Sequence, residues 1–281
     1  MNKLLLMELK RAIKSPVLWM GAIAVIAVNI NAILFNGYGF KIYTSTFLLK
    51  NTSLICIILA VLIPLYLGRD FENRTINNKI SAGYSRKEIF IVEIIVSTLC
   101  AIVLFLADLV SVFISSNIIR LEFSGKVNLA EFTIHAMITL LCIITVSTLY
   151  TMIVIIFHKQ LICLGITVLL TLALLTIGEK SVSRLNQGTT WIDPVTYETV
   201  ENPLRIDGFV RTINNVHVLI SPFAQAKLHP FILSESEAEK KDNSLIIKDF
   251  PYHIEFCLFN ILEILLFYYI GIRIFKKQDL K

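Results

Sequence analysis

The fold is decided by residues 133–177, which read TIHAMITLLCIITVSTLYTMIVIIF, then His158, Lys159 and Gln160, then LICLGITVLLTLALLTI. Neither apolar run contains Asp, Glu, Lys or Arg. A helix needs about 20 apolar residues to cross ~30 Å of hydrocarbon at about 1.5 Å per residue. Because only three residues separate the two runs, the sequence predicts an antiparallel pair of transmembrane helices joined by a tight turn.

Four other segments are also long and apolar enough to cross a membrane. They are residues 16–35, 51–68, 90–119 and 254–272. The chain is 56% apolar and 17% charged, whereas soluble domains average roughly 45–50% and about 25%. We therefore expect an all-α integral membrane protein with six transmembrane helices. The five cysteines have neither zinc nor CxxC spacing, so they are expected to be packing residues.

Lys and Arg are concentrated on one side of the predicted bundle. With six spans, this side holds both termini, the loop between spans 2 and 3, and the 158–160 turn. It carries fourteen cations against five anions, a net charge of +9. The cations are Lys3, Lys10, Arg11, Lys14, Arg69, Arg74, Lys79, Arg86, Lys87, Lys159, Arg273, Lys276, Lys277 and Lys281. Because cytoplasmic loops are rich in Lys and Arg, we expect both termini to be cytoplasmic.

The chain divides into three predicted parts. Residues 1–178 form a membrane domain with an N-terminal interfacial helix at 1–14, spans 1–5 and a cytoplasmic loop at 69–90. Residues 179–253 form a large extracellular segment, in which 205–220 has the spacing of an amphipathic helix and 234–243 that of a surface loop. Residues 254–281 hold span 6 and a cytoplasmic tail.

The loop at 69–90 is too long for a simple reversal of the chain. Residues 72–82 favour a short helix with Ile76 and Ile80 on one face, and Gly83 is a suitable stop. Ser85 and Glu88 have the spacing of a capping box that opens span 3. We interpret the loop as a docking element for a cytoplasmic partner; the alternative is an ordinary charged loop.

The same loop resembles the loop after the second span in permease (transmembrane) subunits of bacterial type-2 ABC transporters. The matching residues are Glu72, Thr75, Ile76, Asn78, Lys79, Gly83, Ser85 and Arg86. Arg74 stands where that family usually has Gly, so the turn before the loop helix is expected to differ. The interfacial helix, six spans and large outer segment extend the resemblance over the whole chain. Further similar positions are Asn202, Pro203, Gly208, Arg211, Pro222 and Gln225.

The resemblance implies a transport subunit of an ABC exporter that is not itself an enzyme. In that family the loop helix sits in a groove of an ATP-binding cassette ATPase subunit. Ile76 and Ile80 would fill the groove, and Glu72, Arg74, Lys79 and Arg86 would pair at its rim, with Lys159 as a second contact. The implied ATPase-coupling residues are therefore Glu72, Arg74, Thr75, Ile76, Asn78, Lys79, Ile80, Gly83, Ser85, Arg86 and Lys159.

The implied partners follow from the same family. The sequence has no G-x-x-x-x-G-K-[ST] motif, so ATP and Mg would be bound by the ATPase chain and no cofactor by this one. A second permease chain, identical or different, would complete the membrane part. The implied location is the bacterial cell membrane, multi-pass, in contact with membrane lipids. No nucleic-acid partner is expected, because no folded basic domain is present.

Polar residues inside the spans are candidates for a translocation path, because they are costly in lipid. They are Asn29, Asp108, Asn260 and Glu263. The alternative is interhelical hydrogen bonding that only fixes the packing. Pro64 is expected to kink span 2. No catalytic set and no metal site is suggested.

Three functions stay open on sequence alone. The first is export of an amphiphilic substrate, such as a peptide, a drug or a lipid-like molecule. The second is a membrane receptor or immunity protein that binds a ligand on its extracellular segment without transporting it. The third is an ion-coupled transporter that uses Asp108 and Glu263, although the internal repeats common in that class are missing here.

Overall fold

The computed structural model of the chain describes residues 1–36, 44, 47–121, 129–188, 190–192, 198–234 and 253–277. Within these residues, six helices are long and apolar enough to span a membrane. They are Pro16–Phe35, Thr52–Glu72, Arg86–Ile118, Leu129–Phe157, Gln160–Leu185 and His253–Lys277. The predicted six-helix membrane protein is confirmed to this extent. Most of the predicted surface loop at 234–243, and the chain end at 278–281, lie outside the described residues.

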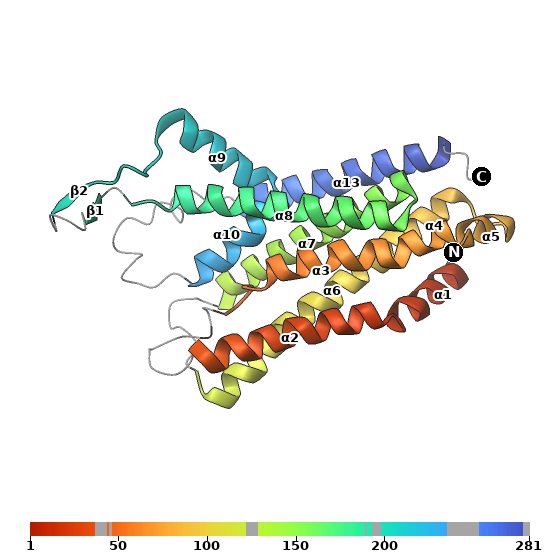
Figure 1. The fold of residues 1–281 in the computed structure, drawn as a ribbon, viewed down its shortest axis with the longest axis horizontal. Coiled ribbons are helices and arrows are strands. Elements are labelled where there is room, and N and C mark those ends of the chain that lie inside the picture. The colour runs from red at the N-terminus through yellow and green to blue at the C-terminus, as the bar shows by residue number, and fades with distance from the viewer. Residues whose placement is uncertain are drawn as a thin grey trace.

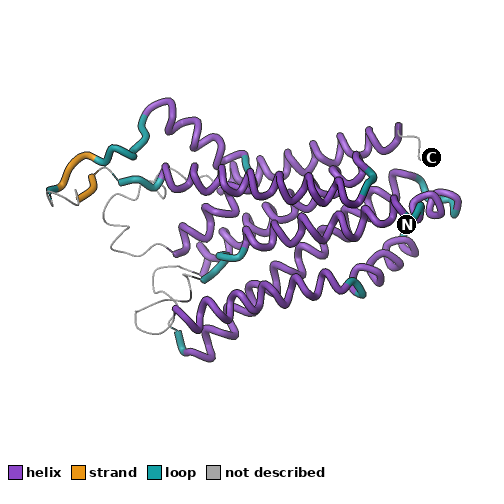
Figure 2. Tube along the Cα trace, viewed as in Figure 1, coloured by secondary structure: helices purple, strands orange, loops and turns teal. Residues whose placement is uncertain are grey.

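The elements follow one another along an almost wholly helical chain (Figures 1 and 2). Their bounds are α1 (Asn2–Ile13), α2 (Pro16–Asn36), α3 (Thr52–Ile63), the π-helix η2 (Pro64–Gly68), α4 (Arg69–Glu72), α5 (Thr75–Ser81), α6 (Arg86–Ile119), α7 (Leu129–Phe157), α8 (Gln160–Leu185), β1 (Thr190–Ile192), β2 (Thr199–Glu201), α9 (Gly208–Ile220), α10 (Pro222–Ser234) and α13 (His253–Lys277). The strands β1 and β2 pair antiparallel, with Thr190 opposite Glu201.

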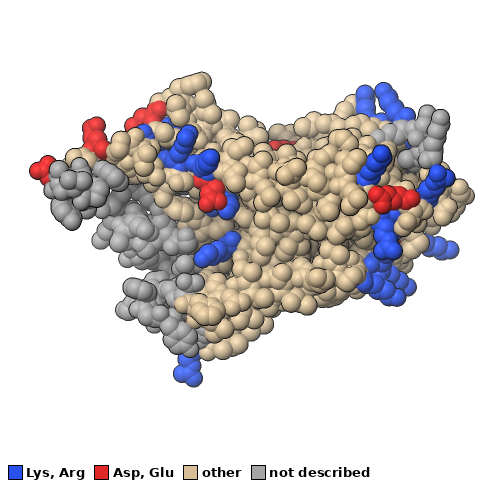
Figure 3. All heavy atoms as spheres, viewed as in Figure 1, with Lys and Arg blue, Asp and Glu red and all other residues tan. Residues whose placement is uncertain are grey.

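The two ends of the bundle differ. One end holds α1, α4, α5, the turn between α7 and α8, and the end of α13 (Figure 1). We call this the basic end; α9, α10 and the strands lie at the opposite end. On the face shown in Figure 3, a broad band of mostly uncharged surface separates the charged side chains of the two ends. This distribution is typical of a protein whose middle lies in hydrocarbon.

Helix boundaries differ from the predicted ones where polar residues continue a helix. The fifth span was expected to stop at residue 177, but α8 continues to Leu185 and includes Glu179 and Arg184. The predicted domain boundary after residue 178 therefore falls inside a helix. Helix α6 begins at Arg86, as the predicted capping box at Ser85 and Glu88 requires, and thus ahead of its apolar part. A helix does not end where its hydrophobicity ends, because its hydrogen bonds continue in water.

Span 2 changes helix type at Pro64, where the sequence predicts a kink. From this residue the chain is π-helical to Gly68 and then continues as α4. Proline has no backbone N–H to donate, and an altered hydrogen-bond pattern accommodates this loss. A Cβ added to Gly68 would lie 2.9 Å from the Cα of Gln160, so the end of span 2 packs directly on the start of α8.

The turn between α7 and α8 is as short as predicted. Helix α7 ends at Phe157 and α8 begins at Gln160. His158 takes the left-handed conformation, with φ of 57°, and its ring packs on Phe71 at a centroid distance of 4.4 Å. The turn is therefore held against α4 at the basic end.

Helix α7 lies at the centre of the bundle. It packs against α3, α6, α10 and α13, and 67% of its span is buried, compared with 28% for α8 and 17% for α13. Two of the polar residues that α7 buries, Thr148 and Thr151, donate their hydroxyls to carbonyls one turn earlier, which satisfies them in an apolar setting. Helices α8 and α13 instead leave apolar faces for lipid or for another chain.

Helix α10 was not predicted, and it is buried at the opposite end of the bundle. It packs on α3, α7 and α8, and Phe223, Gln225 and Leu228 are at most 1% exposed. The close approach to α8 depends on Gly178, because a Cβ there would lie 2.7 Å from the Cα of Ala224. The predicted amphipathic helix at 205–220 is found as α9, beginning at Gly208.

Replacing Gly178 should separate α8 from α10. We expect Gly178→Val to destabilise the folded protein by about 1–3 kcal/mol, because the added side chain meets backbone that has no room to move. Gly165→Val on the same helix is the matched control, since a Cβ at that position meets nothing within 4 Å. Thermal unfolding in detergent measures both. Equal loss of stability in the two variants would contradict the packing described here.

Candidate functional site at the basic end

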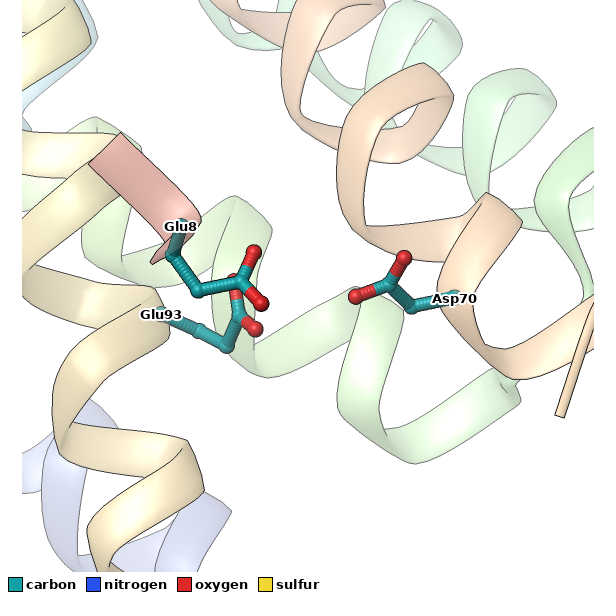
Figure 4. A group of neighbouring side chains, drawn as sticks. All are labelled: Glu8, Asp70 and Glu93. Carbon is teal, nitrogen blue, oxygen red and sulfur yellow. The ribbon is translucent and has the colours of Figure 1, made fainter. Parts of the chain in front are cut away.

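A buried lysine joins three carboxylates at the basic end. The Lys79 Nζ lies 2.8 Å from an oxygen of Glu8, 2.7 Å from one of Asp70 and 2.8 Å from one of Glu93. All four residues are at most 4% exposed. Figure 4 shows the three carboxylates converging from α1, α4 and α6. We call these four residues the Lys79 cluster.

Arg11 and Tyr66 complete the hydrogen bonds of the Lys79 cluster. The Arg11 guanidinium pairs with Asp70 and lies 2.6 Å from Glu8. Tyr66 donates its hydroxyl to the Glu8 carboxylate at 2.7 Å, and Arg11 stacks over the Tyr66 ring at 4.3 Å. Four helical segments, α1, η2, α4 and α6, are thereby tied to α5.

Both cations stay charged despite their burial. Burial on its own would lower the pKa of Lys79, but Glu93, Asp70 and Glu8 outweigh it, and the pKa is raised above its usual value. Burial likewise opposes the charged form of Arg11, whereas Tyr66, Asp70 and Glu8 raise its pKa. Removing one member of such a network leaves an uncompensated charge, which costs more than the pair contributes.

The three carboxylates also have the spacing of a metal site. One oxygen from each of Glu8, Asp70 and Glu93 lies within 4.8 Å of the other two, and oxygen ligands suit Mg²⁺ or Ca²⁺. The Lys79 ammonium, however, contacts all three carboxylates. In this conformation the protein supplies the cation from its own chain.

Local sequence positions α5 through two predicted features. Ser85 and Glu88 form the predicted capping box at the start of α6, and Gly83 ends α5 with φ of 91°. The predicted helix at 72–82 is instead two pieces, α4 and α5, divided at Asn73 and Arg74. Arg74 is left-handed, with φ of 55°, a conformation that glycine adopts at lower cost.

The predicted ATPase-coupling residues differ in their burial, from fully buried through half-buried to exposed. Ile76 and Lys79 are buried in this chain, which differs from the expectation that they face a partner. Ile76 packs in the hydrophobic core, and the Lys79 ammonium pairs with the three carboxylates of the Lys79 cluster. The exposed members are Glu72, Arg74, Asn78, Gly83, Ser85 and Lys159, whereas Thr75, Ile80 and Arg86 are half-buried.

Two of these predicted residues hold neighbouring elements together. The Glu72 carboxylate accepts a hydrogen bond of 3.0 Å from the backbone N–H of Gln160, at the start of α8. Arg86 donates to the carbonyl of Phe275, near the end of α13, at 2.9 Å. The predicted loop and the predicted second contact at Lys159 therefore form one continuous surface.

Two of the four path candidates, Asn29 and Asp108, meet inside the bundle. Asn29 donates to the Asp108 carboxylate at 2.9 Å and to the Ser111 hydroxyl at 2.6 Å. Asn51, which was not among the predicted path residues, donates to both Asn29 and Asp108. Since Asp108 is fully buried, this network packs α2 and the start of α3 against α6.

The other two candidates lie on α13. Asn260 donates to the Gln225 side chain at 2.6 Å and accepts from the Thr145 hydroxyl at 3.0 Å, which joins α13 to α10 and α7. Glu263 is half-buried, and among the described residues its Oε2 has no hydrogen-bond partner. The structure therefore joins Asn29 to Asp108 in one network, places Asn260 in another, and brings Glu263 into neither.

Two histidines meet at the opposite end of the bundle. The Nδ1 atoms of His135 on α7 and His229 on α10 lie 3.0 Å apart, and the His253 ring contacts His135 edge-on at 5.2 Å. Burial lowers the pKa of His229 well below its usual range, and the neighbouring His135 and His253 lower it further. His229 is therefore neutral in the folded protein.

The described parts of the chain thus define a multi-pass membrane protein with a cluster of buried charged side chains at one end of its helical bundle. Comparison with protein-family models and with curated proteins found no match for this chain.

Removing the central cation should destabilise the basic end strongly. We expect Lys79→Met to cost about 3–5 kcal/mol, because three buried carboxylates lose their common partner. Lys87→Met, at an exposed position of α6, should change stability by less than about 0.5 kcal/mol. Adding Glu93→Gln to Lys79→Met should recover part of the loss. Thermal unfolding in detergent measures the stability of all three variants. Equal losses of stability for Lys79→Met and Lys87→Met would contradict the role of the Lys79 cluster.

Acid should destabilise the protein through His229. Its folded pKa is depressed, whereas an unfolded histidine titrates near about 6.5. The unfolded chain therefore binds more protons below that pH, and stability falls as the pH falls through about 6.5. We expect the melting temperature to drop between about pH 7.5 and 5.5, and His229→Asn to show a smaller drop. Parallel pH curves for the two proteins would refute this assignment.

Proposed function

We propose that this chain is the membrane-spanning permease subunit of an ATP-driven exporter of the type-2 ABC class. The observation that carries the proposal is the mechanical link between α5 and the spans. A force applied to α5 passes through Lys79 to α1 and α6, and through Asp70 to the end of span 2. ATP hydrolysis would be performed by separate ATPase subunits, and the basic end would face the cytoplasm.

The exposed surface of the basic end supports docking of such a partner. It combines residues of the α4–α5 loop with the turn before α8, and the Glu72 bond to Gln160 keeps the two parts in register. The exposed cations Arg74 and Lys159 fit an acidic rim. Ile76 and Lys79 then hold the docking element in place and do not contact the partner.

The apolar faces of α8 and α13 support pairing with a second permease chain. Both helices are mostly exposed along their spans, and Glu263 lies half-buried on α13 with a free carboxylate oxygen among the described residues. An amphiphilic substrate passing beside this face would meet a polar group in an apolar setting. The substrate is proposed only at this level of chemistry.

Charge reversal on the docking surface tests the proposal. The chain is tagged, expressed in its source organism, extracted in detergent and purified by the tag, and the copurifying proteins are searched for a P-loop ATPase. We expect the ATPase to copurify, and Arg74→Glu with Lys159→Glu to reduce its recovery about tenfold or more, because like charges then face each other.

Lys180→Glu with Arg184→Glu is the matched control, since both residues are exposed on α8 toward the opposite end. This variant carries the same change in net charge and should retain the ATPase. Failure of the unmodified protein to bring down any ATPase, or equal losses in both double variants, would overturn the proposal.

One observation favours a receptor as the second candidate. Helix α9 exposes an apolar face that the described chain does not cover, including Phe209 at 78% and Ile213 at 51% exposed. Such a face suits either a membrane surface or a ligand. If the chain is a receptor, Phe209→Ser with Ile213→Ser abolishes ligand capture, and the charge reversals at the basic end change nothing.

A further inference from the structure

A cavity beside the Lys79 cluster is not used by the proposed coupling. Its volume is about 530 Å³, within the range of about 300–1,000 Å³ typical of small-molecule sites. It lies where the end of α1 and the start of α2 meet η2, α4 and the start of α5. The cavity opens at the basic end, where span 1 begins.

The cavity walls carry an excess of positive charge. Arg11, Lys14 and Arg69 line it, against the single carboxylate of Asp70. Arg11 is paired with Glu8 and Asp70. In the described part of the chain, no ion pair engages Lys14 or Arg69, and both are exposed. Two cations are therefore available to a ligand.

The remaining lining suits a phosphate ester with an apolar tail. Ser15 and Thr75, whose side chains carry hydroxyl donors, line the cavity together with the apolar residues Pro16, Val17 and Leu65. Further along α2 from the cavity, the side chains of Met20 and Ile23 are 68% and 64% exposed. These residues continue the face of Pro16 along the span, as a surface for an acyl chain.

A tryptophan indicates that the cavity lies at the level of lipid headgroups. Trp19 is half exposed, one turn beyond Pro16 on α2, and its indole donates to the carbonyl of Ile13 at 2.6 Å. Tryptophan is enriched at the boundary between hydrocarbon and water. Cations and hydroxyls at this depth meet the phosphate layer of a bilayer.

We propose that this cavity binds the phosphate headgroup of an anionic phospholipid, with Lys14 and Arg69 as its charged contacts and the exposed face of α2 along one acyl chain. The bound lipid would rest against α1, η2 and α4, the same elements that the Lys79 cluster joins. The proposal depends on the chain lying in a membrane and does not depend on an ATPase partner.

Lipid binding by the detergent-purified full-length chain tests this proposal. Native mass spectrometry measures binding of phosphatidylglycerol and of phosphatidylcholine with the same acyl chains. We expect phosphatidylglycerol to bind about tenfold more tightly, and Lys14→Ala with Arg69→Ala to remove most of that difference, because each cation near the headgroups contributes favourably. Lys14→Ala alone should give an intermediate affinity.

Lys3→Ala with Lys10→Ala is the matched control. Both residues are exposed on α1 and do not line the cavity, so this variant has the same net charge as the test variant and should keep the preference. Equal affinity for the two lipids, or equal losses in the two double variants, would overturn the site. A third arm adds inorganic phosphate: displacement of phosphatidylglycerol at millimolar phosphate would show a site for free phosphate and overturn the lipid assignment.

Discussion

The structure of the basic end depends on one constraint: a buried ammonium must be surrounded by carboxylates that are themselves buried. Lys79 meets Glu8, Asp70 and Glu93 within 2.8 Å. Each carboxylate comes from a different helix. The pairing of the Lys79 ammonium with all three therefore fixes α1, α4 and α6 around α5. The turn between α1 and α2, the cavity beside it and the exposed surface of α4 and α5 all take their positions from this arrangement.

Deeper in the bundle, buried polar side chains are paired by the side-chain amides of Asn and Gln. Asn29 and Asn51 surround Asp108 and hold α2, α3 and α6 together, whereas Asn260 and Gln225 join α13 to α10. Hydrogen bonds between side chains of neighbouring spans fix the positions of the helices, and each contributes about 0.6–2 kcal/mol to stability. The strong charge network therefore lies at the end of the bundle, and the weaker networks lie within the spans.

Much of the fold could be predicted from sequence, because span length, the capping box at Ser85 and the stop at Gly83 are local signals. Helix α10 was missed because it is buried on all sides and so has no amphipathic period. The Lys79 cluster was missed because its member Glu8 lies far in sequence from Asp70, Lys79 and Glu93. One signal was available: Leu4, Glu8 and Ala12 lie on one face of α1, so Glu8 belongs to a stripe that has to be buried.

The link between α1 and the loop has a consequence for biosynthesis. Arg11 and Asp70 are 59 residues apart in the chain, and Lys79 and Glu93 follow later still. Because the ribosome makes the N-terminus first, Glu8 and Arg11 emerge before any of their distant partners exist. Helix α1 therefore reaches its final position only after the next two spans have been inserted and the third has begun, so α1 is made well before the helices that hold it in place.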